Sequence, residues 1–138
     1  MTETSLLEDA LVSVSWLKEK VDERDRLVLW GHSLGAAVAC RAMESLESSG
    51  HQADLVDTLV LESPFNNLLE EIQTVVFDSR GILGTWLANC LPVETVLKWA
   101  DIQFRSDHWI RDLETYTLLL HSEDDKTIPL ELAKKLFR

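Results

Sequence analysis

Leu27-Val28-Leu29-Trp30-Gly31-His32-Ser33-Leu34-Gly35 is the stretch that decides the fold of this 138-residue chain. Its first four residues are apolar and predict a short buried strand. The small residues at 36–39 (Ala, Ala, Val, Ala) predict the start of a helix. The five residues between these elements fit the pattern G-x-S-x-G. A strand, a tight turn and a helix in this order are the context of a nucleophile elbow.

The elbow predicts specific chemistry at Ser33. A sharp turn strains the backbone of this serine and exposes its hydroxyl above the edge of the sheet. Gly31 and Gly35 remove Cβ atoms that would clash where the strand and the helix nearly touch. The backbone N–H of Leu34 would form one half of an oxyanion hole. The alternative interpretation is a glycine-flanked turn that carries an ordinary serine.

Composition limits the possible functions. A chain of 138 residues, 46% of them hydrophobic, suits one globular domain. The net charge of −11 makes nucleic acid an unfavourable partner. No apolar run approaches the roughly 20 residues that a membrane span needs, and the polar, acidic residues 2–9 do not resemble a signal peptide. Cys40 and Cys90 lack the spacing of metal ligands and are expected to be buried free thiols, so we expect neither a metal nor a cofactor.

The rest of the chain alternates predicted helices and strands. Helices are expected over 5–21, 36–47 and 130–137, and strands over 27–30, 58–61 and 117–120. Ser5 and Glu8 fit a capping box at the start of the first helix, and Gly50 suits the end of the second. This order predicts an α/β fold with a parallel sheet and right-handed crossovers. Because the first strand is apolar without alternation, we expect it to be covered on both faces.

A long insert, residues 65–114, separates the second and third predicted strands. Its apolar residues include Phe77, Ile82, Leu83, Trp86, Leu87, Leu91, Val96, Leu97, Trp99, Phe104 and Trp109. One interpretation is an apolar cap over the elbow that binds an acyl chain. The other is a set of helices that pack their own core.

The loop after the third strand supplies a candidate acid. A carboxylate just past a strand end is where a serine hydrolase places the acid that orients its histidine. In the frequent form H-G-x-x-D-x-x-x-P, the acid lies four residues before the proline. Pro129 therefore selects Asp125, and Asp124 is the second choice. A solvated acidic turn is the alternative.

Together these motifs resemble the α/β-hydrolase fold, and within it the lysophosphatidylserine and monoacylglycerol lipases of the α/β-hydrolase-domain family. The resemblance is carried by LWGHSLG (29–35), VLESPFNN (60–67) and LLHSEDDKTIP (119–129). It implies that Ser33 is the nucleophile and Asp125 the triad acid, and that the substrate is a lipid ester, either a lysophospholipid or a monoacylglycerol. It also implies an enzyme of the endoplasmic reticulum membrane. Ser122 stands where the family usually has glycine.

Residues 1–138 are therefore predicted to form the central part of an α/β-hydrolase domain, with a parallel sheet, flanking helices and a helical cap-like insert. The family's catalytic histidine should follow the acid by a few dozen residues, and Arg138 is thirteen residues past Asp125. His32, His51, His108 and His121 are each expected to be structural or solvated. The early strands, the second oxyanion N–H and any membrane anchor are also expected outside this sequence.

The predicted function is that of a serine hydrolase of fatty-acyl esters, with the 138 residues alone poorly soluble and nearly inactive. The alternatives are an inactive, truncated hydrolase scaffold that acts as a binding or regulatory protein, a serine peptidase-type hydrolase, and an incomplete gene model. Aspartate-nucleophile relatives such as dehalogenases are disfavoured because Ser33 holds the nucleophile position.

Overall fold

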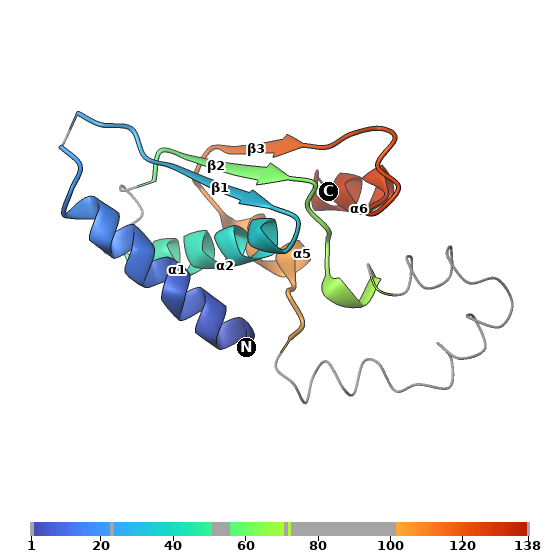
Figure 1. Ribbon diagram of the computed structural model, residues 1–138, viewed down its shortest axis with the longest axis horizontal. Helices are drawn as coiled ribbons and strands as arrows, with labels where there is room; N and C mark the ends of the chain where they lie inside the picture. The colour runs from blue at the N-terminus through green and yellow to red at the C-terminus, as the bar shows by residue number, and fades with distance from the viewer. Residues whose placement is uncertain (1, 23, 51–55, 71, 73–101, 138) are drawn as a thin grey trace, which may run out of the picture.

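A parallel three-stranded sheet forms the centre of the computed structural model, which describes residues 2–22, 24–50, 56–70, 72 and 102–137 (Figure 1). The strands are β1 (Val28–His32), β2 (Thr58–Glu62) and β3 (Thr117–Leu120), in the spatial order β1-β2-β3. Both neighbouring pairs are parallel. The strand predictions are confirmed, with β1 and β2 each extending beyond the predicted carboxyl end, and so is the α/β class.

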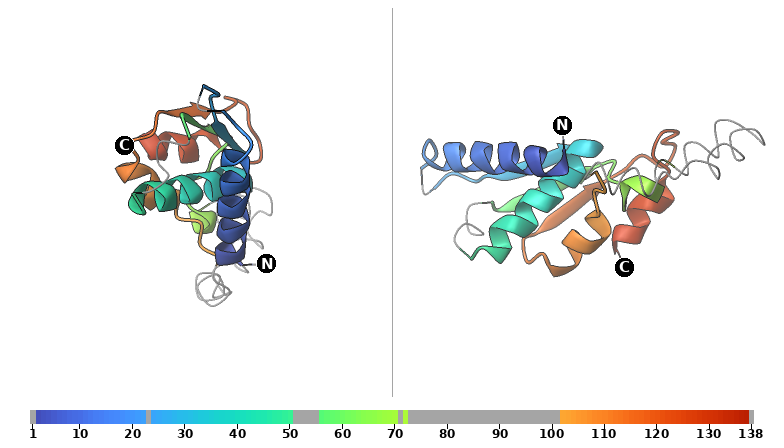
Figure 2. Two further views of the ribbon diagram at one scale, coloured as in Figure 1. Left: turned by 90° about the vertical axis from the view of Figure 1, so that its left-hand side faces the viewer. Right: turned by 90° about the horizontal axis from the view of Figure 1, so that it is seen from below.

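Helices accompany this sheet. Among them are α1 (Glu3–Lys18), α2 (Leu34–Ser48), α5 (Ser106–Trp109) and α6 (Leu130–Lys134), with short 3-10 turns at Ile110–Asp112 and Lys135–Phe137. Figure 1 and the two rotated views of Figure 2 place α1, α2 and α5 on the same side of the strands. The helix predicted over residues 130–137 is split into α6 and the 3-10 turn at Lys135–Phe137.

The core lies between α2 and the sheet. Small side chains on α2 let the helix approach the strands closely, so buried residues of both elements interdigitate. The core cluster consists of Val14, Ala36, Ala39, Cys40, Met43, Leu46, Val56, Leu59 and Leu61. Cys40 is a free, fully buried thiol, and its burial raises its pKa to about 12. A thiol in this environment stays protonated at neutral pH and is unreactive. The other cysteine, Cys90, lies outside the described residues.

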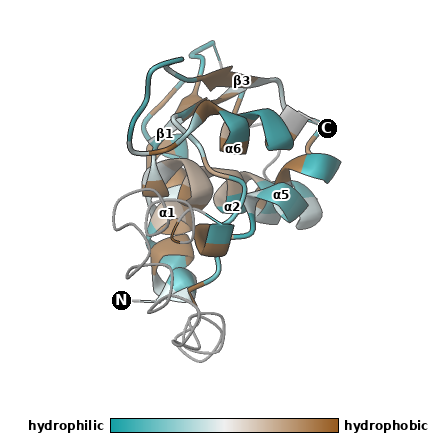
Figure 3. Ribbon diagram, turned by 90° about the vertical axis from the view of Figure 1, so that its right-hand side faces the viewer, coloured by the Kyte–Doolittle hydropathy of each residue, from teal (hydrophilic) through white to brown (hydrophobic). Residues whose placement is uncertain are grey.

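The expectation that β1 is covered on both faces is wrong for the described part of the chain. Alternate residues of β1 face away from α2, and Val28 and Trp30 are 48% and 60% exposed. In the register of the sheet, Trp30 lies beside Val60, which lies beside Leu118. Figure 3 colours β3, the strand that carries Leu118, as hydrophobic. The side chains of β1 therefore alternate between a face that packs against α2 and an apolar face that no described helix covers.

The capping box of α1 is shifted from its predicted position. Thr2 is the N-cap, and its hydroxyl accepts a hydrogen bond from the backbone N–H of Ser5 (3.2 Å), while the Ser5 hydroxyl accepts from the N–H of Thr2 (3.0 Å). Serine thus takes the role usual for glutamate in this motif. At the end of α2, Gly50 adopts the predicted left-handed conformation, with φ of 66°.

The ends of the long insert are described, at residues 65–70, 72 and 102–114. Phe104 is buried, and Trp109 packs partly buried against the core, as the core interpretation predicts for these two residues. The other apolar residues named for the insert, from Phe77 to Trp99, lie outside the described residues. Within the described part of the chain, no helix is long and apolar enough to cross a membrane.

The two glycines of the elbow have different environments. A Cβ at Gly31 would lie 2.2 Å from the carbonyl oxygen of Gly35 and 2.6 Å from the Cα of Ala36. A Cβ at Gly35 would meet no atom of the described residues within 4 Å. The steric argument from the sequence therefore holds for Gly31 and fails for Gly35, because the Gly35 backbone touches β1 while its own Cβ position faces open space.

Gly31→Ala is expected to lower the free energy of unfolding by about 3 kcal/mol, because backbone atoms of α2 must move to accommodate a methyl group. Gly35→Ala is the matched control, since a helical alanine is favoured over glycine by up to about 1 kcal/mol. Thermal or urea denaturation of both variants of the full-length protein measures the difference. Equal stability of the two variants would contradict the close contact at Gly31.

Candidate active site

Ser33 occupies a strained turn between β1 and α2. Its backbone has φ of 53° and ψ of −120°, outside the regions that serine normally adopts. Such a conformation costs about 1–3 kcal/mol and persists only where the surrounding structure imposes it. Here two hydrogen bonds fix the turn: the Ser33 N–H donates to the carbonyl of Glu62 (2.9 Å), and the Ser33 carbonyl accepts from the N–H of Ala36 (2.9 Å). This is the geometry expected of a nucleophile elbow.

Leu34, the predicted oxyanion residue, is the first residue of α2. The amides of a first helical turn have no partner within the helix and are available to bind negative charge. The N–H of Leu34 therefore directly follows the candidate nucleophile at the positive end of a 15-residue helix.

The carboxyl ends of three neighbouring parallel strands meet beside Ser33. Ser63 directly follows β2, and its N–H donates to the carbonyl of Leu120 at the end of β3 (2.8 Å). Ser63 also has a positive φ of 45°. The loop that follows β3 carries Asp125. The topology thus brings together Ser33 and Asp125, which are 92 positions apart in the sequence, on either side of Ser63.

The carboxylate of Asp125 is anchored by donors on both oxygens. Its Oδ1 accepts from the backbone N–H groups of Thr127 (2.8 Å) and Ile128 (2.9 Å), and its Oδ2 accepts from the hydroxyl of Ser63 (3.2 Å). The backbone N–H of Ile128, followed by the donors of Thr127 and Ser63 and the nearby His121, holds the pKa of Asp125 below its usual range, against the opposing effect of partial burial. Asp125 is therefore a fixed, ionised carboxylate at neutral pH.

Asp124, the second choice for the acid, has different surroundings. It is exposed, and its Oδ1 accepts from the hydroxyl of Ser122 within the same loop (2.5 Å). Asp125 instead reaches across to the residue after β2. Of the two aspartates, Asp125 is thus the one that contacts the neighbouring strand end.

The described histidines take other roles or positions. The side chain of His121 is 4% exposed, and its Nε2 donates to the carbonyl of Ile128 (2.7 Å), with the Oδ2 of Asp125 farther away at 3.7 Å. This bond ties the end of β3 to the acid loop. His32 is the exposed last residue of β1, and His108 lies in α5. His51 lies outside the described residues.

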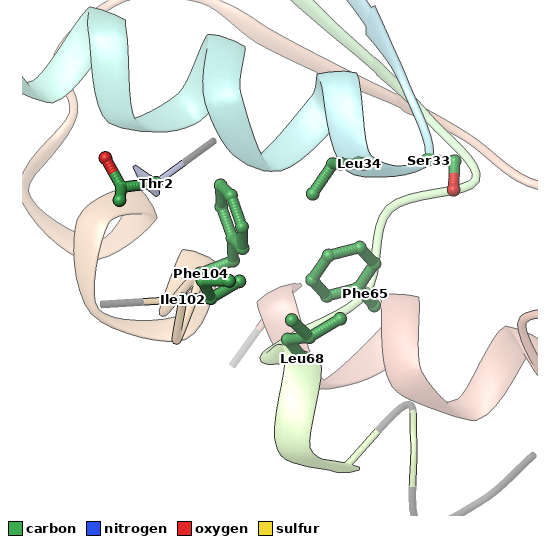
Figure 4. Close-up of a pocket in the computed structure, with 7 residues that line it drawn as sticks. All are labelled: Thr2, Ser33, Leu34, Phe65, Leu68, Ile102 and Phe104. Carbon is green, nitrogen blue, oxygen red and sulfur yellow. The ribbon is translucent and has the colours of Figure 1, made fainter. Parts of the chain in front are cut away.

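An apolar cavity of about 230 Å³ opens beside Ser33 (Figure 4). Figure 4 shows Ser33 and Thr2 at opposite ends of this cavity, with hydrophobic side chains between them. The lining residues are Thr2, Ser33, Leu34, Phe65, Leu68, Ile102 and Phe104. The two ends of the insert therefore form walls of an apolar pocket at the elbow.

The wall at Phe104 is held by the start of α1. Phe104 has a positive φ of 44°, which is rare for a bulky residue. The carboxylate of Glu3 accepts hydrogen bonds from the backbone N–H groups of Gln103 (2.9 Å) and Phe104 (2.8 Å) through one oxygen, Oε2. Segments 100 residues apart in the sequence thus build one side of the pocket.

Three features of the site were missed by the sequence analysis: the contact of Ser63 with the acid, the clamp formed by Glu3, and the contribution of Thr2 to the pocket. For the contact of Ser63 the sequence offers a usable signal, because this serine directly follows β2, the neighbour of the strand that precedes Asp125. In the described part of the chain, no three His, Cys, Asp or Glu side chains are grouped to hold a metal ion.

No family model matches this chain. The lysophosphatidylserine lipase ABHD12 of Danio rerio is 34% identical over 139 residues, which cover 99% of this chain and 34% of the relative. Protein ABHD12B of Homo sapiens is 35% identical over 136 residues, which cover 99% of this chain and 36% of the relative.

The lysophosphatidylserine lipase ABHD12 of Bos taurus is 31% identical over 138 residues, or 99% of this chain. The chain is homologous to the ABHD12 and ABHD12B proteins. The chain spans about a third of the length of these relatives. Its parallel sheet and flanking helices are consistent with part of an α/β-hydrolase fold.

Acidification tests the anchoring of Asp125. Because the folded state holds the pKa of this group below the usual value of 3.8, its contribution to stability is present above that pH and is lost as the pH falls through the folded pKa. We expect Asp125→Asn to be destabilised at pH 7 and the gap from wild type to shrink below about pH 4. Thermal unfolding midpoints between pH 2 and 7 measure this gap.

Asp124→Asn removes the same charge from the same loop and is the matched control. A stability gap of the same size and pH dependence in this control would contradict a special role for the contacts of Asp125.

Proposed function

We propose that this chain forms part of a serine hydrolase that cleaves fatty-acyl esters of the lysophospholipid type. The observation that carries the proposal is the strained Ser33 turn, which opens onto an apolar cavity and lies two strands away from the anchored carboxylate of Asp125. Homology to lysophosphatidylserine lipases supports a lipid ester as the substrate class. The activity is that of the full-length protein.

In this proposal the hydroxyl oxygen of Ser33 attacks the ester carbonyl, and a histidine removes the hydroxyl proton. The N–H of Leu34 stabilises the negative charge on the carbonyl oxygen, and Asp125 orients the histidine and stabilises its protonated form. The histidine then returns the proton to the departing alcohol, and water hydrolyses the acyl-enzyme by the same steps. We assign the base to a histidine outside the described residues, because His121 donates to the Ile128 carbonyl and His32 and His108 lie in β1 and α5.

The pocket supports an acyl substrate. Its walls are aromatic and aliphatic, and its volume of about 230 Å³ is slightly smaller than that of pockets for drug-sized ligands, which begin near roughly 300 Å³. This space suits part of an acyl chain and offers little to a charged head group. We place the acyl chain along the line from Ser33 toward Thr2 and the head group outside the cavity.

The finer assignments rest on family resemblance. A monoacylglycerol is the second substrate within the proposed class, since it presents the same ester and acyl chain with a smaller head group. Location at the endoplasmic reticulum membrane, with the membrane contact supplied from outside these residues, is part of the same proposal.

Two other functions are distinguished by experiment. A catalytically inactive scaffold that binds a partner or a lipid would retain the fold without Ser33-dependent turnover. A serine peptidase would use the same elbow on peptide substrates, but the apolar cavity favours an acyl chain over the polar backbone of a peptide.

Ser33→Ala is expected to lower kcat for lysophosphatidylserine by about 10⁶-fold, because the variant lacks the nucleophile. The full-length protein is assayed by release of free fatty acid, and labelling with a fluorophosphonate probe reports the nucleophile directly. Wild-type protein should be labelled at Ser33, and the variant should not be labelled. A folded wild-type protein without labelling at Ser33 would favour the scaffold interpretation, and preferential cleavage of peptides would favour the peptidase.

Ile102→Trp is expected to fill part of the pocket and to raise KM for a long-chain lysophospholipid by about tenfold, the equivalent of two methylene groups that can no longer be buried. KM for a butanoyl ester should stay within about twofold of wild type. Val12→Trp adds the same side chain at a position 68% exposed on α1 and is the control. An equal change in KM for the short and long esters would place the acyl chain elsewhere.

A further inference from the structure

Ser63 joins two unusual features at the end of β2. Its φ of 45° is one of three positive values among the non-glycine residues that the structure describes, and Ser33 on the neighbouring strand is another. Its hydroxyl donates to Oδ2 of Asp125 across 62 positions of sequence. Serine has no intrinsic preference for this backbone conformation, in contrast to glycine or asparagine. Strained residues of this kind cluster at functional sites, where the surrounding structure imposes the conformation.

The two oxygens of Asp125 are used differently. Oδ1 is occupied by the backbone N–H groups of Thr127 and Ile128, so its position is set by the acid loop itself. Oδ2 accepts from Ser63, while His121 at 3.7 Å is too far for a hydrogen bond and donates instead to the Ile128 carbonyl. A carboxylate oxygen has two lone pairs, so among the contacts of the described residues Oδ2 retains one for a further donor.

We propose that Ser63 is a positioning residue for the triad acid: its hydroxyl fixes the rotation of the Asp125 carboxylate so that the remaining lone pair of Oδ2 faces the histidine that Ser33 requires. This inference rests on the proposed function. Two backbone bonds on Oδ1 hold one oxygen but leave the carboxylate able to swing about it. The donor from β2 supplies the second fixed point, on the side of the sheet where Ser33 lies.

A purely structural role for Ser63 predicts different behaviour in two substitutions. Ser63→Gly removes the hydroxyl and relaxes the positive φ, whereas Ser63→Thr keeps the hydroxyl and increases the backbone strain, because β-branched residues disfavour this region. If only the turn matters, activity follows stability, and the glycine variant is the better enzyme. If the hydroxyl positions Asp125, the order of activity is opposite to the order of stability.

The test uses the full-length protein and Ser33-dependent hydrolysis of lysophosphatidylserine. We expect Ser63→Gly and Ser63→Ala to lower kcat about tenfold or more, the typical effect of one hydrogen bond to a charged group, with KM within about twofold. Ser63→Thr should keep kcat within about threefold of wild type, although its unfolding midpoint lies below that of Ser63→Gly. Ser122→Ala is the matched control. It removes the hydrogen bond from Ser122 to Asp124 within the loop that carries Asp125, and it should leave kcat unchanged.

Wild-type kcat in the glycine and alanine variants would overturn the inference while leaving the proposed function intact. The same conclusion follows if Ser63→Thr is less active than Ser63→Gly. Absence of Ser33-dependent turnover in the wild-type protein would overturn the proposed function and this inference with it.

Discussion

The close contact between β1 and α2 at Gly31 is the constraint on which the rest of this site depends. The backbone of Gly35 occupies the space where a side chain at position 31 would lie. The chain can therefore reverse from strand to helix within two residues, and the residue between them, Ser33, takes a conformation that it would not adopt alone. The small residues that follow keep α2 close to the sheet, so the turn cannot relax by moving the helix away.

Parallel strands then determine what surrounds the turn. All three carboxyl ends lie at one edge of the sheet, so Ser33, Ser63 and the acid loop meet there although they come from distant parts of the sequence. The ladder of backbone hydrogen bonds continues past the strands through Ser33 and Ser63, which fixes their relative height. Asp125 is held from two directions, by its own loop and by the neighbouring strand end.

The pocket depends on contacts of longer range. Glu3 in the first turn of α1 accepts hydrogen bonds from the backbone N–H groups of residues 103 and 104. Phe104 lines the pocket together with Phe65 and Leu68. A single carboxylate thus satisfies two backbone donors and supports a strained turn in the pocket wall. The opposite face of the sheet, around Trp30 and Leu118, is exposed and apolar in the described part of the chain, in contrast to the packed face beneath it.

The sequence by itself determined the elements and the order in which they occur. Strand–turn–helix at residues 27–39, the three apolar strand segments and the candidate acid four residues before Pro129 follow from local pattern and spacing, because periodicity and turn chemistry act over a few residues. Only the tertiary structure decided which contacts those elements make. The unequal roles of Gly31 and Gly35, the open face of β1 and the bond from Ser63 to Asp125 depend on how the strands, α2 and the loops pack in three dimensions, and no local pattern encodes that packing.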